Sequence, residues 1–142
     1  MKIEPVFIIE DDVLYRKALK AFLLNTFPDI RDVKMFPVGE MAVRELNTNP
    51  GMIIIDYFLN SKVSGADNGL EIIKQIRVQK PKIKMIVLSG QDSPGVILEA
   101  IRDYDCVYVQ KDKDAFSHIE RLIKQFLAPK NHSPVVADVK GF

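Results

Sequence analysis

The sequence predicts an α/β domain in which helices cover both faces of a parallel sheet. Short apolar runs of strand length alternate with longer segments whose apolar residues recur at helical spacing. The alternation repeats five times, and it favours parallel pairing because each helix returns the chain to the same end of the sheet. The middle run, residues 52–55, is apolar at every position, as expected of a central strand covered on both sides.

The expected elements follow one another along the chain. The strands are expected at residues 6–9, 33–36, 52–55, 85–88 and 106–109. The helices are expected at residues 13–27, 39–46, 69–78, 94–102 and 114–127. Ser93 and Pro94 would cap and begin the fourth helix. In the first helix, the predicted apolar face consists of Leu14, Ala18, Ala21 and Phe22.

Length and composition narrow the class of protein. The 142 residues fit one domain, and a hydrophobic content of 47% is enough for a sizeable core. The net charge of +1 gives no reason to expect nucleic acid or a membrane surface as a direct partner. No apolar stretch approaches the roughly 20 residues that span a bilayer, and the N-terminus lacks the apolar region of a signal peptide. A cytoplasmic protein is therefore expected.

Polar side chains follow four of the five strand candidates. Glu10 and Asp11 come after the first, Asp56 after the third, Ser89 after the fourth and Lys111 after the fifth. The carboxyl ends of parallel strands meet at one edge of a sheet, which is where ligand chemistry usually lies. Acids, a hydroxyl and an amine gathered at that edge indicate a metal-dependent phosphate site.

Taken alone, each of these residues has an ordinary explanation. A strand-end acid can be a cap, a loop lysine is usually solvated, and a serine is common in turns. Asp12 is expected to cap the first helix and favour its dipole. Cys106, the single cysteine, is expected to be a buried, inert thiol. His118 and His132 lack metal-ligand spacing and are expected to be plain surface residues.

The four features in this order resemble the receiver domain of two-component response regulators. The resemblance covers about residues 6–127, and Asn68-Gly69-Leu70-Glu71 is similar to the Asp-Gly-Leu-Glu stretch that opens the family's third helix. It implies a flavodoxin-like fold with strand order 2-1-3-4-5. Residues 1–128 would form the receiver domain, and residues 129–142 a flexible tail.

The resemblance assigns the acids to phosphoryl and metal chemistry. Asp56 would be the phosphoacceptor, taking a phosphoryl group from a phosphohistidine on a histidine kinase or a histidine phosphotransfer protein. Mg²⁺ would be bound by Glu10, Asp11, Asp56 and the backbone carbonyl of Phe58. The protein would not be an enzyme, apart from Mg²⁺-dependent self-phosphorylation and autodephosphorylation.

The resemblance also assigns a switch. Lys111 would pair with Asp56 and then with a phosphoryl oxygen, while the Ser89 hydroxyl would bind another. Gly90 would leave room beside the phosphate. Ser89 and Tyr108 would form a switch pair that alters the surface of the fourth helix, fifth strand and fifth helix. A downstream protein target or effector domain would bind that surface.

Two features depart from the family pattern. The loop after Asp56 is longer than usual and lacks the usual proline. Asp112 replaces the proline that commonly follows the lysine, so a trans Lys111–Asp112 bond is expected, because a cis bond would cost about 2.5–4 kcal/mol. Phe58 and Gln91 occupy positions that tune loss of the phosphoryl group in the family.

Three other functions remain to be weighed. A haloacid-dehalogenase-type phosphatase normally carries a second Asp two residues after its nucleophile, where this chain has Phe58. A flavin-binding protein would place the cofactor's phosphate after the first strand, where Glu10-Asp11-Asp12 would repel it. A receiver-like scaffold would never be phosphorylated.

Too few residues follow residue 127 for a helix-turn-helix domain, and a stand-alone receiver and an excised one fit equally.

Overall fold

The computed structural model describes residues 2–59, 68–90 and 94–129. Within them, five parallel strands form one sheet in the order β2-β1-β3-β4-β5. The strands are β1 (Val6–Ile9), β2 (Val33–Phe36), β3 (Met52–Asp56), β4 (Lys84–Ser89) and β5 (Val107–Gln110). The predicted fold class and the strand order implied by the resemblance are both confirmed.

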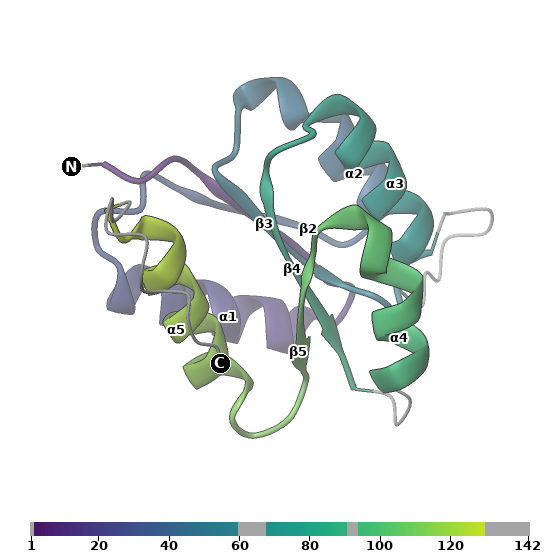
Figure 1. Ribbon diagram of the computed structural model, residues 1–142. Helices are drawn as coiled ribbons and strands as arrows, with labels where there is room; N and C mark the ends of the chain where they lie inside the picture. Colours follow the sequence, from purple (N-terminus) through teal and green to yellow (C-terminus); the bar gives the residue numbers. More distant parts are fainter. Residues whose placement is uncertain (1, 60–67, 91–93, 130–142) are drawn as a thin grey trace.

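The helices cover both faces of this sheet. They are α1 (Val13–Thr26), α2 (Gly39–Arg44), α3 (Gly69–Gln79), α4 (Pro94–Ile101) and α5 (Ala115–Leu127). Figure 1 shows α1 and α5 on one face of the sheet and α2, α3 and α4 on the other. None of the described helices is both long enough and apolar enough to cross a membrane.

Three helices end earlier than predicted, α1 and α4 by one residue and α2 by two. After α2 and α4 the chain tightens into short 3-10 turns, η1 (Leu46–Thr48) and η2 (Arg102–Tyr104). Each turn is followed by a left-handed residue, Asn49 with φ 59° and Asp105 with φ 55°. Asn and Asp adopt this conformation more readily than other side chains, because they are short and polar. These residues end the 3-10 turns and lead the chain into β3 and β5.

The core has two layers because successive strand residues point to opposite faces. In β1, Val6 and Ile8 pack with α1 and α5, whereas Phe7 and Ile9 pack with α2, α3 and α4. All four side chains are fully buried. The uninterrupted apolar runs of the sequence are therefore explained by coverage on both faces.

The predicted apolar face of α1 is wrong at most of its positions. Leu14 is 81% exposed, and Ala18 and Ala21 are also exposed. The helix instead buries Leu19 and Leu23 completely. The chain contains two interleaved apolar series on α1, and packing against α5 and the sheet selects between them. Phe22 belongs to both series and is half-buried.

The strand ends also differ from prediction by one residue. Asp56 and Ser89 are the last residues of β3 and β4, inside the strands rather than beyond them. β5 begins at Val107, so Cys106 lies just outside it and is half-buried rather than buried. Burial still raises the pKa of the Cys106 thiol, which fits the expectation of low reactivity.

The amino-terminal edge of the sheet is held together by Arg77, a residue that sequence reasoning did not single out. Its guanidinium lies 2.8–3.2 Å from five backbone carbonyl oxygens: those of Lys80, Pro81, Ile83, Tyr104 and Asp105. These contacts tie the α3–β4 turn to the turn before β5.

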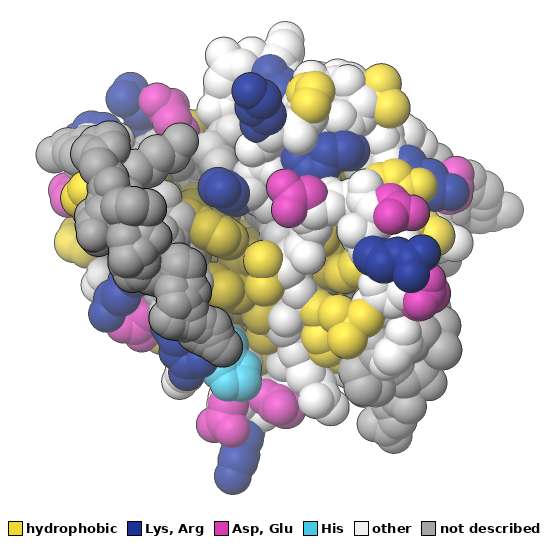
Figure 2. All heavy atoms as spheres, viewed as in Figure 1, with side chains coloured by type: hydrophobic (Ala, Val, Ile, Leu, Met, Phe, Trp, Pro, Cys, Tyr) yellow, Lys and Arg dark blue, Asp and Glu magenta, His cyan; other side chains and the backbone are white. Residues whose placement is uncertain are grey.

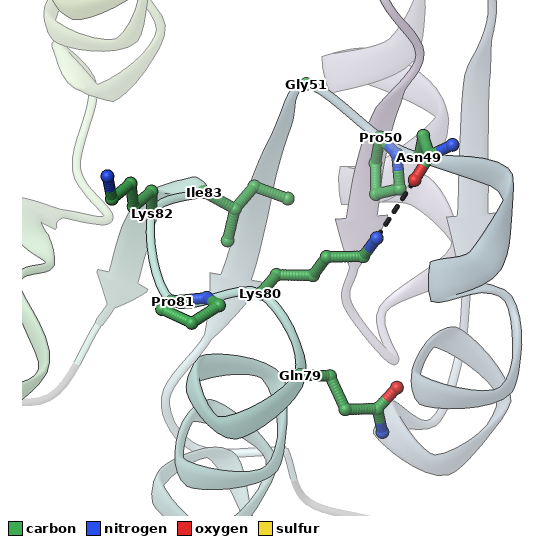
Figure 3. Close-up of a pocket in the computed structure, with 8 residues that line it drawn as sticks. All are labelled: Asn49, Pro50, Gly51, Gln79, Lys80, Pro81, Lys82 and Ile83. Atoms are coloured by element: carbon green, nitrogen blue, oxygen red, sulfur yellow. Dashed lines mark hydrogen bonds between the residues drawn. The ribbon is translucent and has the colours of Figure 1, made fainter.

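Beside the α3–β4 turn is a hollow of about 440 Å³ between residues 49–51 and residues 79–83. Figure 3 shows Lys80 reaching across it to Asn49, with 2.9 Å between Lys80 Nζ and Asn49 Oδ1. The hollow lies at the opposite edge of the sheet from the polar strand ends.

Several sequence-based expectations fall outside the described residues. They concern Ser93 as a helix cap, Gln91, His132 and most of the long loop after Asp56. The structure describes the chain as far as Pro129, just past the end of α5. The division at residue 128 and the flexible tail therefore stay predictions.

Candidate functional site

The carboxyl ends of the strands enclose a polar hollow of about 250 Å³. Its lining consists of Glu10, Asp11, Asp12, Asp56, Phe58, Gly90 and Lys111. The acids come from the ends of β1 and β3, and the lysine from the residue after β5. The structure thus brings together residues that the sequence places far apart, at the edge where parallel strands present their ligand-binding residues.

Lys111 bridges two buried carboxylates. Its Nζ lies 2.6 Å from Glu10 Oε1 and 3.3 Å from Asp56 Oδ2. The side chain of Glu10 is 1% exposed and that of Asp56 is 8% exposed. Buried carboxylates are costly without a partner, and this ammonium partners both. Lys111 was expected to pair with Asp56, but its shorter contact is with Glu10.

Burial is the main cause of the pKa shifts of Glu10 and Asp56. It raises the pKa of Glu10 to about 7, against the hydrogen bond from Lys111, and the nearby Asp56 charge adds to the rise. Burial also raises the pKa of Asp56, with the Lys111 charge and the Phe58 N–H acting in the opposite direction. Without a further cation, the two acids therefore compete for one lysine.

The pKa of Lys111 is raised as well, which favours its charged form. Burial lowers the pKa of Lys111, but the hydrogen bond to Glu10 and the charge of Asp56 outweigh it and raise the pKa overall. Lys111 stays protonated at neutral pH. It therefore provides a fixed positive charge beside Asp56.

The backbone around Asp56 is fixed by contacts with α3. The Phe58 N–H donates to Asp56 Oδ1 at 3.0 Å, and the Gly69 N–H donates to the Tyr57 carbonyl at 3.1 Å. A Cβ at position 69 would collide with the Tyr57 backbone, so a glycine is required for this approach. Asn68 caps α3 by accepting from the Glu71 N–H at 3.1 Å.

The acidic turn after β1 is also held in place. Asp12 accepts from the Tyr15 N–H at 3.0 Å, which confirms its predicted role as the cap of α1. The Arg16 guanidinium donates to the carbonyls of Glu10 and Asp11 at 3.0 and 3.3 Å. Sequence reasoning missed Arg16, although its place one turn into α1 is compatible with a contact to the preceding loop.

The acids are suited to a divalent cation. One oxygen from each of Glu10, Asp11 and Asp56 can be chosen so that all three lie within 4.8 Å of one another. Mg²⁺ prefers such hard oxygen donors and usually retains several waters. The raised pKa values of Glu10 and Asp56 support this fit, because both acids gain from an added positive charge. The Phe58 carbonyl stays a predicted ligand.

Ser89 and Tyr108 interact away from the hollow. Ser89 is fully buried, and its carbonyl accepts from the Lys111 N–H at 2.8 Å. Burial raises the pKa of Tyr108, and the Ser89 hydroxyl acts against that rise. Among the described residues, the buried Tyr108 hydroxyl has no partner at hydrogen-bonding geometry. Gly90, rather than Ser89, lines the hollow.

Three remaining expectations have clear outcomes. All peptide bonds of the described residues are trans, which confirms the expected Lys111–Asp112 bond. A Cβ at Gly90 would meet only the Lys111 side chain, at 3.8 Å or more, so this position is open. His118 is not a plain surface residue: it is half-buried and lines a hollow between β5 and α5.

Solved structures with this fold include several response regulators. The RcsB response regulator from Salmonella typhimurium has a TM-score of 0.74 at 21% identity, covering 92% of this chain and 65% of that one. A CheY-like response regulator receiver domain protein from Methanospirillum hungatei has a TM-score of 0.70 at 16% identity, covering 87% and 94%. These identities are low, so the likeness shows the fold.

The sequence comparisons identify the family. The chain is 29% identical over 116 residues to the transcriptional regulatory protein DegU from Brevibacillus brevis. This match covers 81% of the chain and 47% of the relative, so the chain spans about half of that relative's length. The sequence model of the response regulator receiver domain matches residues 6–133. The chain therefore belongs to the response regulator receiver family and is a phosphoacceptor signalling module of the two-component type.

Proposed function

We propose that Asp56 is the residue that accepts the phosphoryl group. The observation that carries this assignment is a buried carboxylate at the end of β3, held by Lys111 and the Phe58 N–H beside two further acids. Burial and hydrogen bonding orient the oxygens while leaving them at the wall of an open hollow. A buried acid with a raised pKa is typical of a functional site.

The proposed reaction uses the ionised carboxylate as a nucleophile. An Asp56 oxygen attacks the phosphorus of a phosphohistidine, the new O–P bond forms, and the P–N bond breaks. The leaving imidazole keeps the electron pair and takes up a proton. The Lys111 ammonium, already 3.3 Å from Asp56, offsets the charge of the phosphoryl oxygens. Mg²⁺, held by Glu10, Asp11 and Asp56, would supply further positive charge at that centre when bound.

The donor would be a histidine kinase or a histidine phosphotransfer protein. Apolar side chains lie exposed near the site: Val13 is 47% exposed, Leu14 81% and Phe58 39%. Val13 and Leu14 begin α1, directly after the acidic turn. Exposed apolar residues beside a polar site favour a protein partner over a small molecule alone. A cytoplasmic location fits such partners.

The output surface would be formed by α4, β5 and α5. Figure 2 faces this side and shows hydrophobic side chains gathered between α4 and α5, over β5. Leu98 is 50% exposed and Val107 36%. A hollow of about 230 Å³ between β5 and α5 is lined by Tyr108 and His118, among others. Tyr108 thus reaches from this surface toward Ser89, so that the site can influence a bound protein target or effector domain.

This function differs from that of a phosphatase. Phe58 stands where a haloacid-dehalogenase-type enzyme would need its second acid, and the family match supports a signalling module. Self-phosphorylation by small phosphodonors and slow autodephosphorylation are the only turnover proposed. DNA binding is part of the description of one relative of known structure, a response regulator of the LuxR family. Here we propose output through protein contacts.

Intact-mass measurement after incubation with Mg²⁺ and acetyl phosphate tests this function. Wild-type protein should gain one phosphoryl group, and Asp56→Asn should gain none, because the amide is a poor nucleophile of nearly equal volume. Asp12→Asn is the matched control, since Asp12 lines the same hollow but serves as the cap of α1. Labelling of Asp56→Asn would move the acceptor elsewhere, and an unlabelled wild type would favour the scaffold function.

A further inference from the structure

We propose that Tyr15 is a positioning residue whose aromatic face holds the Lys111 ammonium against Glu10 and Asp56. This inference rests on the proposed function, because it assigns Tyr15 a part in preparing Lys111 for the phosphoryl group. Sequence reasoning gave Tyr15 no role. The contact arises from the rotation of α1, which turns Tyr15 inward and Leu14 toward solvent.

The geometry is that of a cation–π contact. Lys111 Nζ lies 4.3 Å from the centre of the Tyr15 ring, well inside the roughly 6 Å over which such attraction acts. The ammonium also contacts the two carboxylates, and the lysine side chain is 18% exposed. Water therefore has limited access to the cation. In these surroundings the negative face of the ring stabilises the ammonium on the side where water would otherwise contact it.

The ring is itself held firmly. The Tyr15 N–H is bound by the Asp12 cap in the first turn of α1. The ring packs edge-on against Phe116 of α5, with centroids 5.6 Å apart and planes at 76°. Phe116 in turn packs on Phe22 at 5.1 Å. A ring fixed between two helices can restrict the rotamers of a lysine that lies on it.

The hydroxyl group does not explain why a tyrosine is placed here. Among the described residues, the buried Tyr15 hydroxyl has no hydrogen-bond partner. Burial raises the pKa of Tyr15 to about 12, so the phenol stays neutral at physiological pH. A buried hydroxyl without a partner costs free energy, and what remains is the contribution of the ring. The aromatic face of Tyr15, rather than its phenol oxygen, is therefore the group that holds the Lys111 ammonium.

A fixed lysine benefits the reaction because its charge is in place before the phosphoryl group arrives. Without the ring, the four-carbon side chain of Lys111 gains rotamers that point away from Asp56. Phosphorylation and binding of the phosphoryl mimic beryllofluoride should both weaken. Preorganised charge is effective because little reorganisation is needed at the moment of reaction.

The test replaces Tyr15 in graded steps. Tyr15→Leu removes the ring, Tyr15→Phe keeps it, and phenylalanines with increasing fluorine content keep its shape while weakening its negative face. Tyr104→Leu is the matched control, since Tyr104 is half-buried on η2, away from the hollow. The readouts are the acetyl phosphate labelling rate, the beryllofluoride affinity and the NMR shifts of the Lys111 methylene protons next to Nζ.

In the wild type, the ring current should move these Lys111 protons upfield, and Tyr15→Leu should abolish that shift. Labelling rate and beryllofluoride affinity should fall about threefold in Tyr15→Leu, recover in Tyr15→Phe and decline steadily with fluorination. Unchanged or faster labelling in folded Tyr15→Leu, or no trend with fluorine content, would overturn the inference. An unlabelled wild type would instead refute the proposed function, while the Lys111 shifts would still report the contact.

Discussion

Lys111 Nζ lies 0.7 Å closer to Glu10 Oε1 than to Asp56 Oδ2, at 2.6 against 3.3 Å. Before phosphorylation, the lysine is therefore held mainly by the acid that follows β1, and only secondarily by the proposed phosphoacceptor. A phosphoryl group on Asp56 would add negative charge on that side and compete with Glu10 for the ammonium. Glu10 thus acts as the resting partner of Lys111.

Glu10 should make the metal-free protein less stable as pH rises. Its pKa is about 7 in the folded state against an ordinary 4.5, so between these values the folded protein holds a proton that the unfolded chain has lost. The contribution of Glu10 to the free energy of unfolding is therefore complete below about pH 4.5 and lost by pH 7. From pH 4.5 to pH 8, Glu10→Gln should gain about 1–3 kcal/mol relative to wild type.

Urea unfolding in EDTA at several pH values measures this change. Glu99→Gln is the control, because Glu99 is exposed on α4 and its pair with Arg102 is a surface contact. If wild type instead gained stability relative to Glu10→Gln over this range, Lys111 would be keeping Glu10 ionised.

Mg²⁺ affinity should depend on Asp11. Replacing Asp11 by Asn removes one of three clustered carboxylates and should weaken binding roughly tenfold or more, because Mg²⁺ favours charged oxygen ligands. Asp12→Asn keeps the helix cap and should change affinity far less. Titration of Mg²⁺ followed by amide NMR shifts gives both constants. Equal affinities in wild type and Asp11→Asn would place the metal elsewhere.

Beryllofluoride should draw the Ser89 hydroxyl away from Tyr108 and toward Asp56. Without a phosphoryl mimic, Ser89 is fully buried and its hydroxyl interacts with the Tyr108 hydroxyl. A new acceptor at Asp56 would compete with Tyr108 for the Ser89 hydroxyl. Tyr108, whose hydroxyl is already buried, should become more restricted in this inward position. Structures and Tyr108 ring shifts with and without beryllofluoride would show both changes.

Ser89→Ala should still bind beryllofluoride, more weakly, but should lose the response of Tyr108. Ser117→Ala, an exposed serine on α5, serves as the control. A full Tyr108 response in Ser89→Ala would mean that the signal reaches β5 by another route.

Arg77→Met should reduce the free energy of unfolding by about 2–4 kcal/mol. The substitution leaves five backbone carbonyls without their shared donor and loosens the turns that lead into β4 and β5. Arg102→Met should change stability by less than about 1 kcal/mol, since Arg102 is 65% exposed. Urea denaturation measures both. Acetyl phosphate labelling of folded Arg77→Met should stay near wild type, because Arg77 lies at the opposite edge of the sheet.

Much of the fold could be predicted from local sequence patterns. Apolar runs of strand length and helical segments repeat in order, and the physics behind these patterns acts over a few residues. Asp12 as a cap and the polar residues at the ends of β1, β3, β4 and β5 could be found for the same reason. Helix ends were less predictable, because the chain passes from α2 and α4 into 3-10 turns that end at Asn49 and Asp105.

The sequence alone therefore determined the α/β class, the strand-end acids and the resemblance to receivers, whereas packing decided how the site is assembled. Glu10 and Lys111 are 101 positions apart, and no local pattern specifies that their contact is shorter than that of Lys111 with Asp56. The orientation of α1 buries Leu19 and Leu23 against the core, and the same orientation places Tyr15 on the lysine. Such contacts depend on the whole core and become visible only in the tertiary structure.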